Sequence, residues 1–286
     1  YEIWLQKPGE LGVYQQIERA GRVCYKSENN ATADSAQPFV ERMMKSKHTA
    51  MLEHGTVYLK GEGLEKYKAN KFSHYKHVDG TDYVTTNLRV LEENGWMDDL
   101  QLFCEPTAHH DLRITVHFTT QISITREYNR HRANSMAEQS TRYCNYTKNK
   151  FGNEITINLP EWVSNQADFD DATAEVSPET FSSLCQEVAE GKSQQWSKLQ
   201  YWLFANLAAE YSYMNMINAG CKPQEARAIL PLDCNTELVH TAFISDWRHF
   251  FDLRALGTTG APHPDAKLLA YPLMLEFQEK GYLDEK

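Results

Sequence analysis

Residues 112–143 read LRITVHFTTQISITREYNRHRANSMAEQSTRY and combine the two kinds of element on which the fold depends. From Ile114 to Phe118, apolar side chains alternate with polar ones, which is the period-two pattern of a half-buried strand. The residues that follow become helical toward Arg130. Because other helical stretches lie on both sides of this strand along the chain, we expect an α+β fold.

Outward from this stretch, the apolar periodicity predicts mostly helices, with a few short strands. The predicted helices cover residues 14–26, 37–47, 87–94, 179–218 and 235–255, and the predicted strands cover residues 56–59, 83–86 and 114–118. The last of these helices is predicted because apolar side chains recur at steps of three and four from Val239 to Phe250. Pro223 suits the first turn of a further helix, which Pro231 would end. Residues 152–178 are predicted to be a loop or a surface segment.

The length of 286 residues is enough for a full hydrophobic core. We expect a single compact domain over residues 1–286, in which a small, mostly antiparallel sheet is flanked by several long helices. Residues 60–108 are polar and rich in aromatic side chains. We expect them to be an insertion on that core and not a separate domain.

The chain carries 29 Lys and Arg against 39 Asp and Glu, which gives a net charge of −10. Affinity for nucleic acid depends on neutralising many phosphates, so this balance argues against a general nucleic-acid binder and against binding to an anionic membrane. No apolar run approaches the roughly 20 residues that span a bilayer. Residues 1–5 show no secretory signal, and the six cysteines are scattered without a CxxC pair. We therefore expect reduced thiols and a cytoplasmic protein.

Residues 121–150 differ from the rest of the chain because they hold six Lys or Arg and only two acids, a local balance of +4. Four of the six are Arg, which binds phosphate through two parallel hydrogen bonds and keeps its charge. Arg126 and Arg130 would share a helix face, and Ser140 and Arg142 have the spacing of an extended segment. A solvated basic face is the simplest explanation of such a cluster. The many Asn, Gln, Ser and Thr side chains around the charges favour a nucleotide site instead.

Several well-known site motifs are absent from the sequence. It contains no GxxxxGK[ST] phosphate loop, no GxGxxG dinucleotide fingerprint, no GxSxG nucleophile elbow and no HExxH zinc motif. The eleven histidines do not come with further ligands at zinc spacing, so we expect no metal site.

The pattern RHR-x7-S, which runs from Arg130 to Ser140, resembles the signature of the flavin-dependent thymidylate synthases. The residues around it, Glu138-x-Ser140-x-Arg142-Tyr143, are similar to the longer form of that signature. Three further segments resemble the family in the same order along the chain. They are His48-x4-Glu53-His54, the segment ARAILP at Ala226–Pro231 and the segment HFFDLR at His249–Arg254.

This resemblance implies the thymidylate synthase-complementing fold and an enzyme that converts dUMP to dTMP. The carbon would come from 5,10-methylenetetrahydrofolate, FAD would carry the hydride, and NADPH would reduce the flavin. Members of the family are homotetramers with active sites at subunit interfaces. The expected partners are therefore further copies of the chain and small molecules, with no nucleic acid and no membrane.

The resemblance also assigns residues to these ligands. The dUMP pocket would be lined by Glu127, Arg130, Glu138, Gln139, Ser140, Arg142, Arg227 and Arg254. FAD would be contacted by His48, Arg130, His131, Arg132, Ala133, Glu138 and His249. Arg254 would be the catalytic residue, because it matches the arginine that lies against the uracil ring in the family.

Uracil C5 is a weak nucleophile. Thymidylate synthases outside the flavin-dependent family activate it by adding a cysteine thiolate to C6. None of the six cysteines lies at a matched motif position, so no cysteine nucleophile is expected. A fixed guanidinium beside the pyrimidine would instead stabilise negative charge that develops on N3 and O4.

The chain departs from the family at several positions. Glu127 stands where Gln is frequent, and its carboxylate would repel the phosphate of dUMP if it pointed toward it. Ala50, Phe243 and Ser245 align with Thr, Asn and Arg positions that contact the flavin, and His249 falls where Asn is common. These departures leave a nucleotide-binding module without turnover as the alternative. An RNA-binding protein is disfavoured by the net charge of −10.

Overall fold

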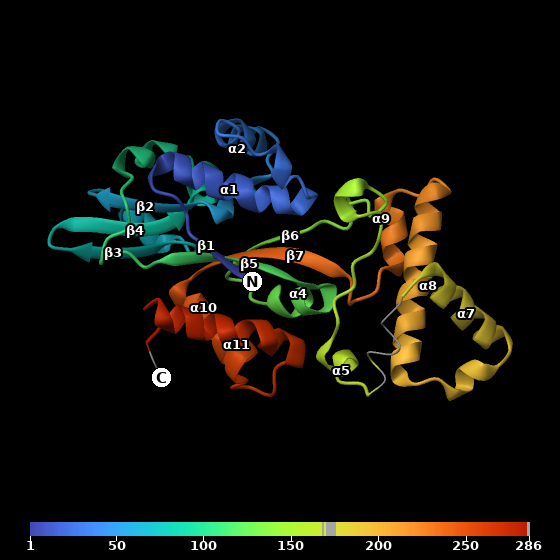
Figure 1. The fold of residues 1–286 in the computed structure, drawn as a ribbon. Helices are drawn as coiled ribbons and strands as arrows, with labels where there is room; N and C mark the ends of the chain where they lie inside the picture. Colours follow the sequence, from blue (N-terminus) through green and yellow to red (C-terminus); the bar gives the residue numbers. More distant parts are fainter. Residues whose placement is uncertain (168, 170–175, 285–286) are drawn as a thin grey trace. The chain divides into compact units, whose positions relative to one another are not determined.

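A computed structural model describes residues 1–167, 169 and 176–284, and it shows an α+β fold, as the sequence predicted (Figure 1). The helices are α1 (Gly9–Tyr25), α2 (Ala36–Lys45), α3 (Leu88–Asn94), α4 (Ile122–Tyr128), α5 (Glu161–Ser164), α7 (Pro178–Ala189), α8 (Lys198–Asn218), α9 (Pro223–Ala226), α10 (Ile244–Phe251) and α11 (Pro264–Glu279). The strands are β1 (Glu2–Trp4), β2 (Thr56–Gly61), β3 (His74–Val78), β4 (Thr81–Asn87), β5 (Arg113–Gln121), β6 (Ser135–Glu138) and β7 (Asn235–Phe243).

The chain divides into two compact units, which we describe one at a time. Unit 1 consists of Tyr1–Thr119, Arg126–Gln139 and Glu237–Lys286. Unit 2 consists of Thr120–Thr125 and Ser140–Thr236.

A four-stranded sheet in the order β1-β5-β7-β6 forms one layer of unit 1. Strand β1 pairs antiparallel with β5, with Ile3 opposite Val116. Strand β6 pairs antiparallel with β7, with Ala137 opposite Val239. Every residue of β7 after the first is buried, so this strand is covered on both faces.

The predicted helix over residues 235–255 is wrong in its first half. Residues Asn235–Phe243 form strand β7, and only Ile244–Phe251 form the regular helix α10. Because β7 is covered on both faces, its apolar residues do not alternate with polar ones; they fall in two adjacent pairs, Leu238-Val239 and Ala242-Phe243, whose spacing of four is also that of a helix face. Helix α11 and strands β1, β3 and β6 were not predicted.

A second sheet of unit 1, in the order β2-β4-β3, is antiparallel throughout. Leu59 of β2 lies opposite Val84 of β4, and both side chains are fully buried. Val13 and Ile17 of α1 belong to the same apolar cluster. Residues 60–108 supply β3, β4 and α3, and several of their side chains are part of this core.

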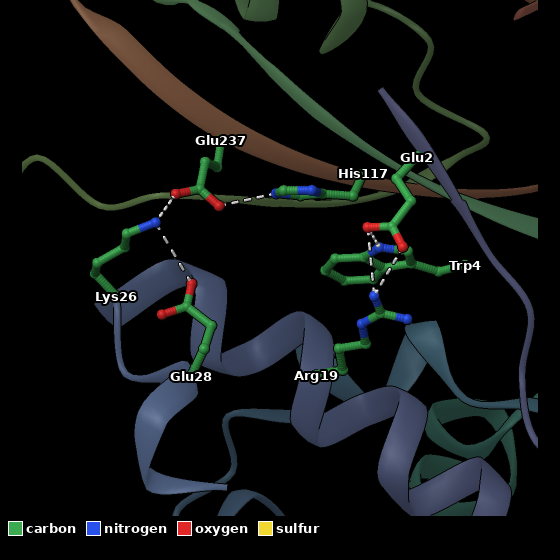
Figure 2. A network of polar contacts seen from close by, with 7 residues as sticks. All are labelled: Glu2, Trp4, Arg19, Lys26, Glu28, His117 and Glu237. Carbon is green, nitrogen blue, oxygen red and sulfur yellow. Dashed lines mark hydrogen bonds and ion pairs between the residues drawn. The ribbon is translucent and has the colours of Figure 1, made fainter. Parts of the chain in front are cut away.

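Polar and aromatic side chains link β1, α1, β5 and β7 in unit 1 (Figure 2). The Trp4 indole stacks on the His117 imidazole with 4.6 Å between ring centroids, and the Arg19 guanidinium lies over the same indole. Glu237 forms a hydrogen bond with His117 Nε2 (2.9 Å) and an ion pair with Lys26. Burial would raise the pKa of Glu237, but its hydrogen bonds with His117 and Lys26 outweigh burial and hold that pKa below its usual value.

The predicted helix over residues 179–218 is two helices in unit 2, α7 and α8. Gly191 lies between them with φ of +74°, a conformation that ends helices and that glycine adopts without strain. Ser197 and Gln200 then form a capping box at the start of α8, in which each side chain accepts a hydrogen bond from the other residue's backbone N–H. The break is therefore encoded locally by a glycine and a capping pair.

The core of unit 2 is a buried cluster of residues from several segments, among them Ile155, Tyr213 and Cys234. Pro223 begins helix α9, as predicted, and a short 3-10 turn follows it before Pro231. Residues 152–178 hold the short helix α5, and part of that range, 168 and 170–175, lies outside the described residues. No helix in the described part of the chain is long and apolar enough to cross a membrane.

Candidate active site

A cleft of about 900 Å³ lies in unit 1. Three segments line it: residues 127–134 at the end of α4, the helix α10 with the turn that follows it, and the loop and helix start at 259–264. The first segment is the centre of the RHR signature, and the second carries Arg254. The structure thus brings together two segments that lie more than a hundred residues apart in the sequence.

Tyr128 anchors the end of α4 and so positions the signature. Its side chain is fully buried, its hydroxyl donates to the carbonyl of Ala266 (2.8 Å), and its ring packs on Phe118 and Phe250. Helix α4 ends at this residue. The expectation that Arg126 and Arg130 share a helix face is therefore wrong, because the helix stops before Arg130.

In the turn after Tyr128, neighbouring side chains of the signature differ in their exposure to solvent. Arg130 and Arg132 are exposed, whereas His131 between them is buried. The backbone N–H of His131 donates to the Tyr128 carbonyl, and that of Asn134 donates to the His131 carbonyl. Within the described residues, neither Arg130 nor Arg132 forms an ion pair, so both guanidiniums at the cleft are open to an anion.

Arg254 is held by three contacts in the same cleft. It lies in a π-helical turn, Asp252–Leu256, that continues α10; such turns occur frequently at functional sites. Its Nη1 donates to Glu127 Oε2 (2.5 Å), its Nη2 donates to the Glu127 carbonyl oxygen (2.6 Å), and its Nε donates to His131 Nε2 (3.2 Å). The guanidinium is therefore fixed in position by the chain's own groups.

His131 accepts one of these bonds because it is uncharged. Burial, followed by the nearby Arg254 and His249 side chains, lowers the pKa of His131 to about 4. An imidazole that accepts at Nε2 carries its proton on Nδ1. His249 lies beside it, with 5.7 Å between the two ring centroids.

The cleft also contains residues that the sequence did not assign to a ligand, among them Asn134, Asp246 and the loop from Thr259 to Pro262. Burial raises the pKa of Asp246 above its usual value. Asp246 precedes His249 by three residues on α10, and this helical spacing is the one signal that could have placed it at the site. Asn134 donates to Nε2 of the fully buried His240 (2.6 Å).

Three other predicted site residues of unit 1 do not line this cleft. Glu138, in β6, accepts a hydrogen bond from the side chain of Asn129 (2.9 Å). Gln139 is buried, and its backbone N–H donates to the carbonyl of Glu237. His48 is exposed at the start of a 3-10 turn.

The remaining predicted residues, Ser140, Arg142 and Arg227, lie in unit 2. The Arg142 backbone N–H donates to Ser140 Oγ (3.3 Å), and its Nε donates to the side chain of Gln224 (3.3 Å). Arg227 Nη1 donates to Thr141 Oγ1 (3.4 Å). Both arginines are exposed and bonded only to neutral groups in the described residues, which is the chemistry of a site for an anionic group.

The chemistry of the cleft fits flavin adenine dinucleotide (FAD). Arg130 and Arg132 offer two exposed guanidiniums without a carboxylate partner in the described residues, as a diphosphate requires. The volume of about 900 Å³ is at the upper end of the range for ligand sites. Phe243 is buried and stacks on His74 (3.6 Å between centroids), so this departure from the family is used for packing. No group of His, Cys, Asp and Glu among the described residues could hold a metal ion.

Comparison with protein families finds one model, described as thymidylate synthase complementing protein, that matches residues 83–280. Among solved structures, the fold search finds a crystal structure of the UMP/dUMP methylase PolB from Streptomyces cacaoi bound with 5-Br dUMP. It is 16% identical in sequence with a TM-score of 0.40, over 97% of this chain and 89% of that chain. A search of curated proteins finds no match. The matched range contains the whole of the RHR signature and Arg254.

Proposed function

The chain belongs to the thymidylate synthase complementing protein family, and from this premise we propose that it is a flavin-dependent thymidylate synthase that converts dUMP to dTMP. One observation carries the proposal. The family match spans all three segments that line the cleft, and in that cleft Arg254 is held in place beside the exposed arginines of the signature. The methyl carbon would come from 5,10-methylenetetrahydrofolate.

Arg130 and Arg132 would hold the diphosphate of FAD, with His131, Ala133 and His249 beside it in the cleft. The bound flavin would supply a hydride, which no side chain can provide, after reduction by NADPH. His131 contributes a neutral ring to this site, because its pKa is lowered to about 4. No positive charge is therefore added there near neutral pH.

Arg142 and Arg227 are the groups we propose for the phosphate of dUMP, since both are exposed and lack carboxylate partners in the described residues. Arg254 would act on the uracil ring, as the resemblance implies. A guanidinium that is fixed in a partly buried site stabilises developing negative charge more than a mobile guanidinium does, because it needs no reorientation during the reaction.

The assembly and the compartment are further parts of this proposal. We propose a homotetramer with active sites at subunit interfaces. Large apolar side chains that are exposed on α8 and α11, such as Tyr211 and Leu268, would be covered in such an assembly. The six cysteines lie among the described residues and form no disulfide there, which agrees with the proposed reducing, cytoplasmic environment.

The first experiment is the absorption spectrum of the purified protein, followed by release of tritium from [5-³H]dUMP. We expect a yellow protein that releases tritium only with the folate and NADPH present. A colourless protein that takes up no FAD and releases no tritium would contradict the proposal.

A nucleotide-binding module without turnover is the second candidate. It is favoured by the packing of Phe243 against His74, because this aromatic ring stands where the family has a flavin-contacting Asn. Tight dUMP binding without flavin reduction by NADPH would identify such a module.

A further inference from the structure

The charged side chains of the cleft differ in whether they are paired. Arg130, Arg132 and Arg254 are its arginines, and Glu127 and Asp246 are its carboxyl groups. In the described residues only one arginine of the three forms an ion pair, that of Arg254 with Glu127. The arginines of the signature remain available for phosphate, whereas Arg254 already has a counterion.

The contacts between Arg254 and its neighbours leave it little freedom. A guanidinium has five N–H donors, and three of them are taken by Glu127 Oε2, the Glu127 carbonyl oxygen and His131 Nε2. The side chain of Arg254 is only 13% exposed, against 40% for Glu127. The arginine is therefore largely withdrawn from water, and its two remaining N–H donors are the ones a ligand can use.

A carboxylate at position 127 does what a neutral amide cannot do. A glutamine would also accept the bond from Nη1, but it would leave the Arg254 charge without a counterion in a partly buried place, which is unfavourable. With Glu127 the pair is neutral overall. A neutral, oriented donor pair suits the polar edge of an uncharged ring better than a phosphate or a carboxylate.

We propose that Glu127 is a positioning residue that neutralises Arg254, fixes its orientation, and thereby makes this part of the cleft select an uncharged pyrimidine ring over an anionic one. The proposal rests on the proposed function and deepens it, because it names the determinant of ring selectivity. It also gives Glu127 a role other than direct contact with the phosphate of dUMP.

The contacts by which Glu127 holds Arg254, which we call the clamp, are tested in the free protein by NMR. Hydrogen exchange of the Arg254 Nη1–H, which donates to the Glu127 carboxylate and is assigned by its loss in Arg254→Lys, is compared in the wild type, Glu127→Gln and Glu127→Asp. We expect exchange to accelerate on the order of tenfold in Glu127→Gln, because the charge-assisted hydrogen bond from Nη1 becomes a weaker bond to a neutral amide, and to be partly restored in Glu127→Asp. Glu93→Gln is the control, since it removes an arginine-paired glutamate of unit 1 that is about as exposed as Glu127, 44% against 40%. Equal exchange in the wild type and in Glu127→Gln would overturn the clamp.

Selectivity is tested by calorimetric binding of dUMP and of 5-carboxy-dUMP, which carries an additional negative charge on the ring. We expect Glu127→Gln to shift the ratio of the two affinities toward the carboxylated ring by about tenfold, and Glu93→Gln to leave the ratio unchanged. A purely structural role of the Glu127–Arg254 pair would weaken both ligands together, and an unchanged ratio would overturn the selectivity. A wild-type protein that binds neither nucleotide would overturn the proposed function and the selectivity with it, and the exchange measurement would then decide the clamp alone.

Discussion

At the scale of single residues, unit 1 contains buried histidines, and a count of charges in the sequence does not reveal their state. His54 is fully buried, and its Nδ1 forms a hydrogen bond with Thr241 Oγ1 (2.8 Å). Burial, with the Arg113 charge nearby, lowers the pKa of His54 to about 3. Burial also lowers the pKa of His240 well below its ordinary value. Such residues are neutral when folded and take up a proton only when the chain unfolds.

The first prediction follows from His54. Because the unfolded state binds a proton below about pH 6.5 and the folded state does not, stability is highest above that pH and falls as the pH decreases toward 3. We expect the stability lost between pH 7 and pH 5 to be smaller by about 2 kcal/mol in His54→Gln than in the wild type. Urea unfolding at both pH values measures this difference. The exposed His109→Gln should retain the wild-type loss, and an identical loss in His54→Gln would contradict the prediction.

The second prediction concerns Arg254. Removal of the guanidinium in Arg254→Ala should lower dTMP formation on the order of a hundredfold, while the flavin stays bound, because Arg130 and Arg132 are intact. Arg254→Lys keeps the charge but cannot form all three contacts, so we expect it to resemble the alanine variant in kcat. A near-normal kcat in Arg254→Ala would remove the proposed role of this residue.

The third prediction concerns Cys144, which directly follows the signature. Its side chain is fully buried in unit 2, so it is poorly placed to act as a thiolate nucleophile. Cys144→Ala should reduce stability by about 1 kcal/mol and keep turnover within about twofold of the wild type. A folded but inactive Cys144→Ala protein would favour a covalent route through the thiol.

At the scale of elements, the start of the chain is held on unit 1 by side chains and not by a long strand. Strand β1 has only three residues, and the stack of Arg19, Trp4 and His117 ties it to α1 and β5 (Figure 2). Glu237 extends this link from β7 to Lys26 at the end of α1. The side chain of Glu237 is only 10% exposed, and its partners His117 and Lys26 are partly buried, so replacing it removes contacts that are shielded from water.

The fourth prediction compares the two glutamates that lie near Lys26. Glu237→Gln removes the charge that pairs with both His117 and Lys26, and we expect a loss of about 2 kcal/mol at pH 7. Glu28→Gln removes a more exposed partner of the same lysine at 3.9 Å, and we expect a change below about 0.5 kcal/mol. Because the pKa of Glu237 is lowered in the folded state, its contribution should disappear as the pH falls below the usual range for a glutamate. Thermal unfolding of both variants at pH 7 and pH 4 tests this. Equal losses of stability in the two variants at pH 7, or a loss in Glu237→Gln that is the same at both pH values, would contradict the prediction.

At the scale of the whole molecule, the proposed homotetramer requires apolar surface that subunits can share. Leu268, Tyr271 and Leu275 are exposed large apolar residues on α11, and their spacing of three and four places them on one helix face. The expectation of a single domain also belongs to this scale, and it stays a prediction. One cooperative unfolding transition that includes both units would support it.

The fifth prediction is the mass in solution. Sedimentation should give about four times the chain mass of 33.0 kDa, as a homotetramer of four identical chains requires. Tyr271→Glu should lower that mass, because a charge in an apolar interface is unfavourable, and the exposed Lys45→Glu should not. A monomeric wild type would contradict the tetramer. A tetramer that tolerates Tyr271→Glu would contradict only the use of this helix face.

Local patterns in the sequence were sufficient for elements that carry their own signals. The alternation at Ile114–Phe118 predicted β5, Pro223 predicted the start of α9, and the RHR signature predicted the family that the match over residues 83–280 supports. The net charge of −10 with a local +4 pointed to small anionic ligands. These inferences depend on neighbours along the chain, which the sequence states directly.

Other features required the tertiary structure, because they depend on contacts between distant segments. Strand β7 was mistaken for a helix since its burial on both faces comes from the elements around it, not from its own pattern. The sequence could assign Glu127 and Arg254 to the dUMP pocket only by resemblance, and it predicted that Glu127 would repel the phosphate if its carboxylate pointed toward it. Only the folded chain brings these two residues, 127 positions apart, into an ion pair, because the contact depends on how the end of α4 packs against the turn after α10 and not on neighbours along the chain.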